Sequence, residues 1–427
     1  MARNIKDISH LLGNYGLSTF ATAAVSGSHL LVQLAVLHSL GNAEFGLVAF
    51  MLTLMQFGSG LCNSMVAAPF TVLINTDRSA QSAEGLFLIN AGLALCNAAV
   101  AVLTVFWLGT ATVGTALAFA ASSALFTVRW FARTEAYAMH NPVRAALSDV
   151  VYAAVLLTCL AIAWFYGMSL SEAAGLFAIA GCAGMLPFGK AFLVKHFRVS
   201  LQSALASYGP VWRDQARWAV AGLVTTEATS NAHAYIVTSV AGPAAFAPIA
   251  AAMLFLRPIG VCMVSLTQIE RPAMARALST GNRAGALRYV ARFMAVLGFM
   301  WLSTIVAVAC IVHFFPALAF KPGLDANLIL ISFVLWAAVC LVQCVQTPLN
   351  VFLQAEGRFR ELAGASIKSS LLTLVAVPML LVVVGPIYST IGVMLGQIVM
   401  TLGIVVSVRR SRYGEAINPA TAQAEAR

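Results

Sequence analysis

Twelve long apolar segments occupy most of the chain, and they constrain its fold more than any other sequence feature. They run over residues 16–38, 45–75, 86–108, 113–131, 145–166, 173–195, 217–240, 244–269, 289–314, 327–353, 365–384 and 389–408. About 20 apolar residues are enough to cross a bilayer as a helix, and a helix satisfies its own backbone hydrogen bonds in lipid. The sequence therefore predicts an all-α polytopic membrane protein with 12 transmembrane helices.

Composition excludes a soluble protein, and the sequence carries no motif of an enzyme. Charged residues make up 9% of the chain and hydrophobic residues 60%, whereas soluble domains carry about 25% charged residues. The eight cysteines all fall inside apolar segments, and none has the spacing of a zinc site. No catalytic constellation or nucleotide-binding loop is present. We therefore expect a protein that is not an enzyme and has no cofactor and no metal.

Positive charges mark one side of the membrane. Of the 25 Lys and Arg residues, 23 lie at the termini or in alternate connections, and the opposite connections contain only Lys321. By the positive-inside rule, both termini are cytoplasmic. This bias explains most of the net charge of +10, so we expect no nucleic-acid partner. Arg129, Arg133 and Arg144 belong to this set, and we interpret them as topology determinants and lipid-headgroup anchors.

The chain divides into two similar halves. We expect an N-terminal six-helix lobe over 1–195, a cytoplasmic interlobe linker over 196–216, a C-terminal six-helix lobe over 217–408 and a cytoplasmic tail over 409–427. An offset of 201 places Phe45 on Phe246 and Gln56 on Arg257, and an offset of 217 places 138–149 on 355–366. Six spans per half make this a parallel, pseudo-symmetric repeat, whose substrate site is expected near the middle of the membrane.

Polar side chains form stripes along several predicted spans. In the first span they fall within an arc of about 80°, and in the tenth they recur at i, i+3 and i+7. Such stripes either line a hydrated path or hold the helices together. We interpret them as lining, and the predicted substrate-binding residues are Ser26, His29, Gln33, Gln56, Gln343, Gln346, Asn350 and Arg257.

Glu227 and Arg257 are the charged residues expected near the middle of adjacent spans. The turn between those spans lies near Ala241 and Gly242, at a similar distance from each. A central arginine is costly to insert, so it needs a partner or a hydrated cavity. One reading is a structural ion pair. In the other, Arg257 binds an anion and Glu227 is a counter-charge or the ion-coupling site.

Four short motifs resemble polysaccharide-unit flippases of the multidrug/oligosaccharidyl-lipid/polysaccharide exporter superfamily. They are Leu40-Gly-Asn-Ala-Glu-Phe-Gly-Leu, Phe131-Ala-Arg-Thr-Glu-Ala-Tyr, Ala355-Glu-Gly-Arg-Phe-Arg and the last hairpin around Gly385-Pro-Ile-Tyr-Ser-Thr-Ile-Gly. The resemblance covers nearly the whole chain, although each motif is short.

The resemblance implies a flippase in a bacterial inner membrane. Such a protein moves polyprenyl-diphosphate-linked oligosaccharides, the precursors of exopolysaccharide, capsule or O-antigen, by alternating access. Its partners would be that substrate and membrane lipids, with a polysaccharide polymerase and export machinery as candidate protein partners. Arg257, as the one cation inside a span, would bind the diphosphate. The sequence departs from the family pattern at Gln56, which stands where a second cation would complete a clamp.

Three other functions stay open from the sequence. A cation-coupled multidrug antiporter of the same superfamily would use a buried carboxylate, for which Glu227 is the candidate. A membrane-embedded glycan polymerase would need larger external loops than the sequence offers. A scaffold of an export complex would not need polar stripes inside its spans.

Overall fold

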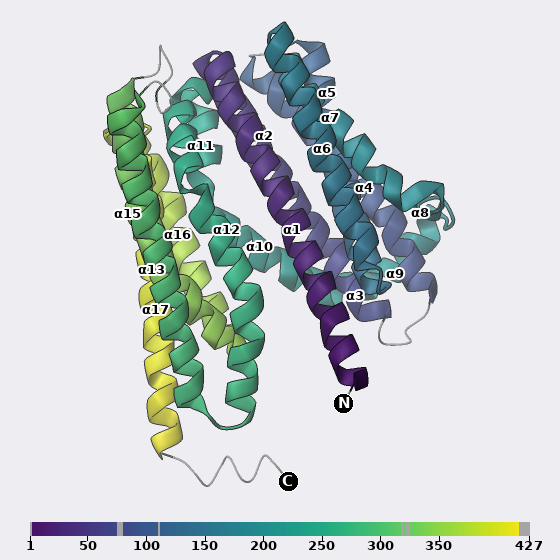
Figure 1. Ribbon diagram of the computed structural model, residues 1–427, viewed down its shortest axis with the longest axis vertical. Coiled ribbons are helices and arrows are strands. Elements are labelled where there is room, and N and C mark those ends of the chain that lie inside the picture. Colours follow the sequence, from purple (N-terminus) through teal and green to yellow (C-terminus); the bar gives the residue numbers. More distant parts are fainter. Residues whose placement is uncertain (1, 75–79, 110–111, 317–319, 321–324, 418–427) are drawn as a thin grey trace. The chain divides into compact units, whose positions relative to one another are not determined.

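The computed structural model describes residues 2–74, 80–109, 112–316, 320 and 325–417, nearly all of them helical (Figure 1). The elements η1 and η3 are π-helical turns, and η2 is a 3-10 turn. In chain order the elements are α1 (Ala2–Ser39), α2 (Asn42–Cys62), η1 (Asn63–Ala67), α3 (Ala68–Ile74), α4 (Ala80–Leu108), α5 (Val113–Ala138), α6 (Pro142–Tyr166), α7 (Leu170–Met185), η2 (Leu186–Phe188), α8 (Gly189–Lys195), α9 (Leu201–Val211), η3 (Trp212–Ala216), α10 (Arg217–Ser230), α11 (Ala232–Ala241), α12 (Pro243–Ser279), α13 (Arg283–Phe314), α15 (Ala326–Ala355), α16 (Phe359–Val383) and α17 (Ser389–Ile417).

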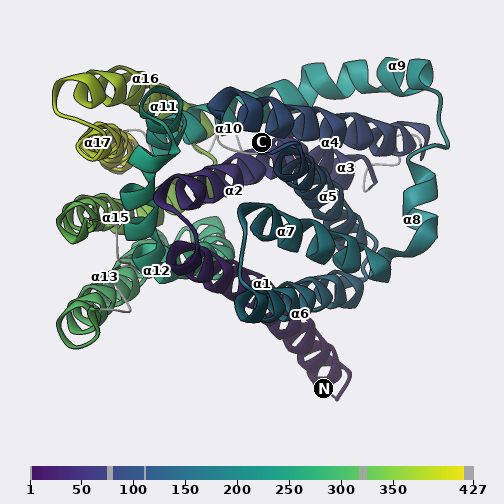
Figure 2. The ribbon, with the colours of Figure 1, turned by 90° about the horizontal axis from the view of Figure 1, so that it is seen from above.

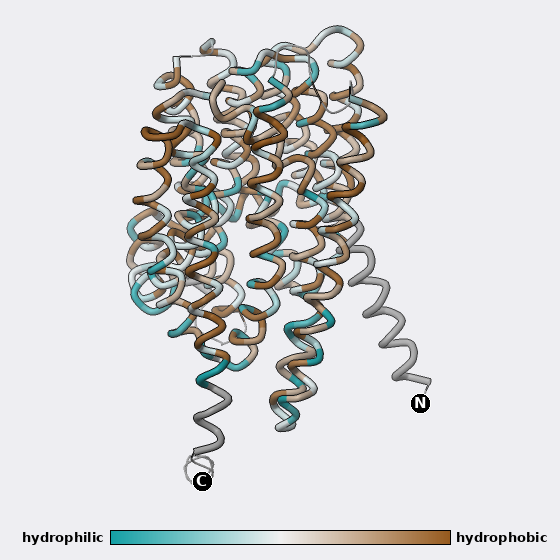
Figure 3. Tube along the Cα trace, turned by 90° about the vertical axis from the view of Figure 1, so that its left-hand side faces the viewer, coloured by the Kyte–Doolittle hydropathy of each residue, from teal (hydrophilic) through white to brown (hydrophobic). Residues whose placement is uncertain are grey.

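Eleven helical segments within these ranges are long and apolar enough to cross a membrane. Figure 3 shows them as long hydrophobic stretches, with hydrophilic residues concentrated toward helix ends and turns. The second and sixth spans continue through the short turns η1 and η2, so α2 runs on into α3 and α7 into α8. The predicted multi-pass membrane protein is confirmed, and eleven of the twelve predicted spans are continuous.

The seventh predicted span is interrupted. α11 has 10 residues, too few to cross a hydrocarbon core of about 30 Å at 1.5 Å per residue. α10 has 14 residues and is not part of any described segment that is apolar enough to cross. Asn231 separates them, and its side-chain amide donates to the Glu227 carboxylate at 2.8 Å. A break of this kind is tolerated in a membrane where nearby polar groups satisfy the backbone and side chains around it. Together the two short helices supply the twelfth span.

The chain folds into two compact units. Unit 1 comprises Met1–Val224 and Thr238–Ala250, and unit 2 comprises Thr225–Val237 and Ala251–Arg427. Within unit 1, α5 packs against α4 and α7, and α6 against α1 and α7 (Figure 2). Within unit 2, α17 packs against α15 and α16, and α13 against α15. Spans four and six of each half therefore meet, as do spans five and six, while the lobe boundaries at 195 and 217 stay a prediction.

Helix bounds reproduce the internal repeat. α2 begins at Asn42 and α12 at Pro243, 201 positions later, while α6 and α16 both have 25 residues and begin 217 positions apart. An arginine at the start of the fifth span of each half binds a backbone carbonyl in the second half of the sixth. Arg144 donates to the Pro187 carbonyl at 2.9 Å, and Arg358 donates to the Ser407 carbonyl at 2.7 Å. The predicted pseudo-symmetric repeat is confirmed.

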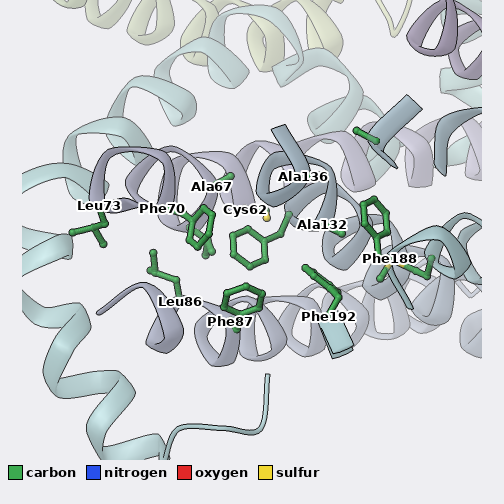
Figure 4. Close-up of a cluster of buried hydrophobic side chains, with 14 of the residues drawn as sticks. Cys62, Ala67, Phe70, Leu73, Leu86, Phe87, Ala132, Ala136, Phe188 and Phe192 are labelled. Atoms are coloured by element: carbon green, nitrogen blue, oxygen red, sulfur yellow. The ribbon is translucent and has the colours of Figure 1, made fainter. Parts of the chain in front are cut away.

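An aromatic cluster packs one end of unit 1. Phe70, Phe87, Phe131 and Phe192 come from α3, α4, α5 and α8, and each is at most 3% exposed (Figure 4). The rings of Phe87 and Phe131 meet edge to face with centroids 4.9 Å apart, which is a favourable aromatic geometry. The cluster joins four helices that are distant in sequence, so it holds the spans together next to the interlobe linker.

Candidate functional site

The polar side chains along the first span differ in burial and in hydrogen bonding. His29 and Gln33 are buried, whereas Ser26 is half-buried. The Nε2 atom of His29 and the hydroxyl of Tyr152 are hydrogen-bonded at 2.8 Å, and Gln33 donates to the His29 carbonyl at 3.3 Å. Of the predicted site residues on this span, His29 and Gln33 are thus engaged inside unit 1, and Ser26 is the most accessible of the three.

A buried ionic cluster lies beside His29, and the sequence did not predict it. Arg129 of α5 forms an ion pair with Asp149 of α6 at 2.7 Å, and Arg133 binds the second carboxylate oxygen at 2.9 Å. Arg129 is 3% exposed and Asp149 is fully buried. With two guanidinium groups and one carboxylate, this cluster carries an excess positive charge. It can attract an anion or repel a cation that enters unit 1.

Neighbouring residues shape the cluster. The Arg129 guanidinium carbon lies 4.1 Å from the centroid of the Tyr152 ring, which adds a cation–π contact. A side chain at Gly184 would place its Cβ 3.0 Å from Arg129 Cδ and 3.2 Å from Tyr152 Cβ. Gly184 therefore makes room for both, and its carbonyl accepts a hydrogen bond from Ser148 at 2.6 Å.

The interpretation as a headgroup anchor is wrong for Arg129, and it stays a prediction for Arg133 and Arg144. Arg129 is too deeply buried to contact a lipid headgroup. Arg133 is 16% exposed and is held by Asp149. Arg144 is bound to backbone carbonyls at Pro187 and Phe188, in the turn η2 within the sixth span. All three have structural partners inside unit 1, which the sequence alone could not reveal because those partners lie on other helices.

In unit 2, Glu227 is bound by its own segment. Its carboxylate accepts hydrogen bonds from the Asn231 amide at 2.8 Å and from the Tyr235 hydroxyl at 3.4 Å. These donors follow at four and eight positions, so the carboxylate lies across the break between α10 and α11. An acidic side chain at a helix break can take up a proton or a cation there.

Arg257 has a different environment. It is half-buried on α12, and among the described residues it has neither an ion-pair nor a hydrogen-bond partner. Glu227, which belongs to the same unit, is bound to Asn231 and Tyr235 instead. The reading of Glu227 and Arg257 as a structural ion pair therefore finds no support within the described residues, and the guanidinium remains available to an anion.

The other predicted site residues are distributed as follows. Gln56, which stands at the position equivalent to Arg257, is exposed on α2 in unit 1. In unit 2, Gln346 is 6% exposed, and its Oε1 atom has no hydrogen-bond partner among the described residues. Gln343 and Asn350 are half-buried on the same helix, and Asn350 accepts from the Gln354 amide at 3.3 Å.

The repeat aligns the ionic cluster with neutral residues. Helices α5 and α15 end at Ala138 and Ala355, 217 positions apart, as are the starts of α6 and α16. The same offset pairs Arg129 with Gln346, Arg133 with Asn350, Asp149 with Ser366 and Tyr152 with Ser369. In unit 2, Ser366 and Ser369 bind the hydroxyls of Thr225 and Thr229 at 3.1 and 3.3 Å. The contacts made at these equivalent positions are thus ionic in the first half and neutral in the second.

Solved structures share this fold. No protein-family model matches the chain, and no curated protein matches its sequence. A structure of the lipid II flippase MurJ in an inward closed conformation matches with a TM-score of 0.64 and 14% identity, over 92% of this chain and 87% of MurJ. An inward-facing multidrug resistance MATE family transporter of the MOP superfamily gives a TM-score of 0.62 and 14% identity, over 92% of this chain and 95% of the transporter. The chain has the fold of these transporters.

The match covers the whole architecture rather than one half. An outward-facing MATE family transporter also matches, with a TM-score of 0.56 and 14% identity, over 92% of this chain and 93% of the transporter. The predicted fold, with twelve spans in two pseudo-symmetric six-helix halves, is therefore confirmed. Because a lipid II flippase and multidrug resistance transporters both adopt it, the fold does not choose between those functions.

Proposed function

We propose that this protein is a flippase for polyprenyl-diphosphate-linked oligosaccharides in a bacterial inner membrane. It supplies glycan units for exopolysaccharide, capsule or O-antigen by alternating access, beside a polysaccharide polymerase and export machinery. The lipid tail stays in the bilayer, and the charged, hydrated headgroup passes through the protein. The headgroup therefore needs a cation for its diphosphate and hydrogen-bonding groups for its sugars.

The unpaired guanidinium of Arg257 carries this proposal. A buried or half-buried charge in a membrane is costly unless something compensates it, and no described residue does so for Arg257. Guanidinium binds phosphate oxygens in a bidentate fashion, and a low dielectric strengthens that bond. A substrate diphosphate would supply the missing counter-charge. The excess positive charge of the Arg129, Arg133 and Asp149 cluster also favours an anionic substrate over a cationic one.

Polar side chains with spare hydrogen-bonding capacity suit the sugar part. Gln346 has a buried amide oxygen without a partner among the described residues, and unmet capacity of this kind favours a ligand donor. The exposed Gln56 and the half-buried Ser26 and Gln343 offer further donors and acceptors. We propose these residues, with His29, Gln33 and Asn350, as the sugar-contacting set, and Glu227 as the ion-coupling residue.

A cation-coupled multidrug antiporter is the second candidate function. Two observations favour it: a multidrug resistance MATE family transporter shares the fold with a TM-score of 0.62, and the Glu227 carboxylate is not neutralised by Arg257. Against it stands the positive cluster of unit 1, which would repel a cationic drug. The two functions make opposite demands on Arg257, because a cation antiporter should tolerate its neutralisation.

The deciding experiment replaces Arg257 in the source bacterium. Arg257→Ala should abolish surface polysaccharide and accumulate diphosphate-linked oligosaccharide, at unchanged protein abundance, while Arg257→Lys should keep part of the activity. Arg276→Ala is the matched control, because Arg276 is exposed near the end of the same helix. Normal polysaccharide together with altered sensitivity to cationic dyes would instead support the antiporter.

A further inference from the structure

The interlobe linker forms a helix that is fixed to unit 1 along one face. Ala204 of α9 is buried, and a Cβ at Gly85 of α4 would lie 2.7 Å from the Ser207 hydroxyl. The Tyr208 hydroxyl donates to the carbonyl of Met65, inside the π-helical turn η1, at 3.0 Å. Figure 2 shows α9 alongside α4. These contacts determine which side of α9 faces away from the protein.

The outward side carries large apolar side chains. α9 has 11 residues, and it belongs to none of the described helical segments that are long and apolar enough to cross a membrane. Exposed Leu, Phe and Trp on a short helix that does not cross are typical of a helix lying in the membrane interface. The exposed side chains are Phe197 (80%), Leu201 (63%), Leu205 (55%), Trp212 (40%) and Trp218 (66%).

Arginines flank this apolar side. Arg198, Arg213 and Arg217 are exposed, and Asp214 is the one acidic residue within 197–218. The Arg217 guanidinium carbon lies 4.7 Å from the centroid of the Trp218 ring. None of the three arginines has an ion-pair partner among the described residues. With three positive charges and one negative charge, the segment has a net positive charge that favours anionic ligands.

We propose that residues 197–218, here called the linker surface, bind anionic phospholipids of the cytoplasmic leaflet. Arg213 and Arg217 bind headgroup phosphates, while Leu201, Leu205 and Trp212 insert at the level of the upper acyl chains. The topology places this segment on the cytoplasmic side, where the leaflet surface is negative. Tryptophan is the side chain most suited to that depth, because one end of it is apolar and the other donates a hydrogen bond.

The linker surface is connected to the helix that carries Glu227. α9, η3 and α10 follow one another without a break from Leu201 to Ser230, so the linker surface and the segment that carries Glu227 belong to one helical run. The docking on η1 through Tyr208 keeps the inner face of α9 in place. Anionic lipid therefore fixes the outer face of α9 at the membrane surface.

The test compares two pairs of arginine substitutions in the full-length purified protein. Arg213→Gln/Arg217→Gln removes two charges from the linker surface, and Arg276→Gln/Arg288→Gln removes two exposed charges elsewhere on the cytoplasmic side. Binding of phosphatidylglycerol against phosphatidylcholine is measured by native mass spectrometry from mixed micelles. An arginine near an anionic surface contributes about 1 kcal/mol, or about fivefold in affinity, so the linker pair should lower phosphatidylglycerol affinity by more than tenfold. The control pair should leave that affinity within about twofold.

Equal loss in both pairs would show a net-charge effect and overturn the proposal, as would a wild type without preference for phosphatidylglycerol. A second measurement tests the apolar side. In nanodiscs with lipids brominated in the upper acyl chain, fluorescence quenching should be smaller for Trp212→Phe/Trp218→Phe than for wild type. Fractional quenching that is equal or larger in the double variant would show that these two rings lie no closer to the bromines than the other tryptophans, and would reject the linker surface as a lipid site.

Discussion

Arg129 and Asp149 form an ion pair at 2.7 Å inside unit 1, and the residues 217 positions further along the chain are Gln346 and Ser366. The two halves therefore have the same helix arrangement, but residues at equivalent positions form ionic contacts in unit 1 and neutral hydrogen bonds in unit 2. In unit 1 charged groups tie the fourth span to the fifth. In unit 2 hydroxyl hydrogen bonds join α16, the fifth span of the second half, to α10 in the seventh predicted span. One of them runs from Ser366 to Thr225 at 3.1 Å. A substitution in the ionic cluster of unit 1 therefore has a matched control at the equivalent, neutral position of unit 2.

Asp149→Asn should destabilise the protein strongly. The substitution leaves Arg129 and Arg133 buried without their shared counter-charge, and breaking a buried pair in this way costs about 3–5 kcal/mol. The matched control is Ser366→Ala, which removes one neutral hydrogen bond worth about 1 kcal/mol. Thermal unfolding of the purified proteins in detergent measures both. A smaller loss for Asp149→Asn than for Ser366→Ala would contradict a structural role of the ionic cluster.

Tyr208→Phe should loosen the linker helix. The hydroxyl is the group that binds the Met65 carbonyl, and the loss of one such hydrogen bond should cost about 1 kcal/mol. Burial raises the pKa of Tyr208 to about 12, so the hydroxyl stays protonated at neutral pH. Stability from this group is lost only as the pH rises above the unfolded pKa of about 10. Hydrogen exchange at 63–69 measures the loosening, and unchanged exchange would show that packing alone holds α9.

His196 should make stability fall in acid. Burial lowers the pKa of this imidazole below its usual value, and its Nε2 atom lies 3.4 Å from the Asn90 amide nitrogen. As the pH falls below about 6.5, the unfolded chain takes up a proton at His196 more readily than the folded chain. The unfolding temperature should therefore drop less between pH 8 and pH 5 in His196→Gln than in wild type. Parallel curves for the two proteins would exclude this histidine as a source of acid sensitivity.

Hydropathy predicted the fold because lipid leaves the backbone few options. Span positions follow from the length of apolar runs, and the charge bias of the connections sets the orientation. Helix ends were less predictable, since α12 continues to Ser279, ten residues beyond the predicted span. That extension contains polar residues outside the apolar run, so a hydropathy criterion cannot see it. The break at Asn231 was missed for a related reason. The apolar pattern runs through it, and the Glu227 carboxylate that binds Asn231 has no hydropathic signature.

The candidate site was only partly readable from the sequence. Arg257 and Glu227 stood out because charges inside an apolar span are rare. Arg129 and Asp149 did not, because each lies near the end of a span, where a charge usually faces water. Their ion pair joins two helices whose rotation the sequence does not set. The sequence does contain one signal for Arg129. The 217-residue offset aligns this arginine with Gln346, which belongs to the polar stripe of the tenth span, so it indicates that Arg129 also faces other helices.

Glu227→Gln tests the ion-coupling role. The amide is nearly isosteric with the acid and can still accept hydrogen bonds from Asn231 and Tyr235, so the break between α10 and α11 should persist. If Glu227 exchanges a proton during transport, the substitution removes that step, and transport should lose its pH dependence between pH 5 and pH 8. Rates are measured as translocation of lipid-linked oligosaccharide into the lumenal leaflet of inverted membrane vesicles, with the pH set on each side. Tyr235→Phe is the control, since it removes one donor to the carboxylate but leaves the acid in place and should keep a pH-dependent rate. An unchanged profile in Glu227→Gln would remove Glu227 from coupling and leave it with the structural task of holding Asn231 at the helix break.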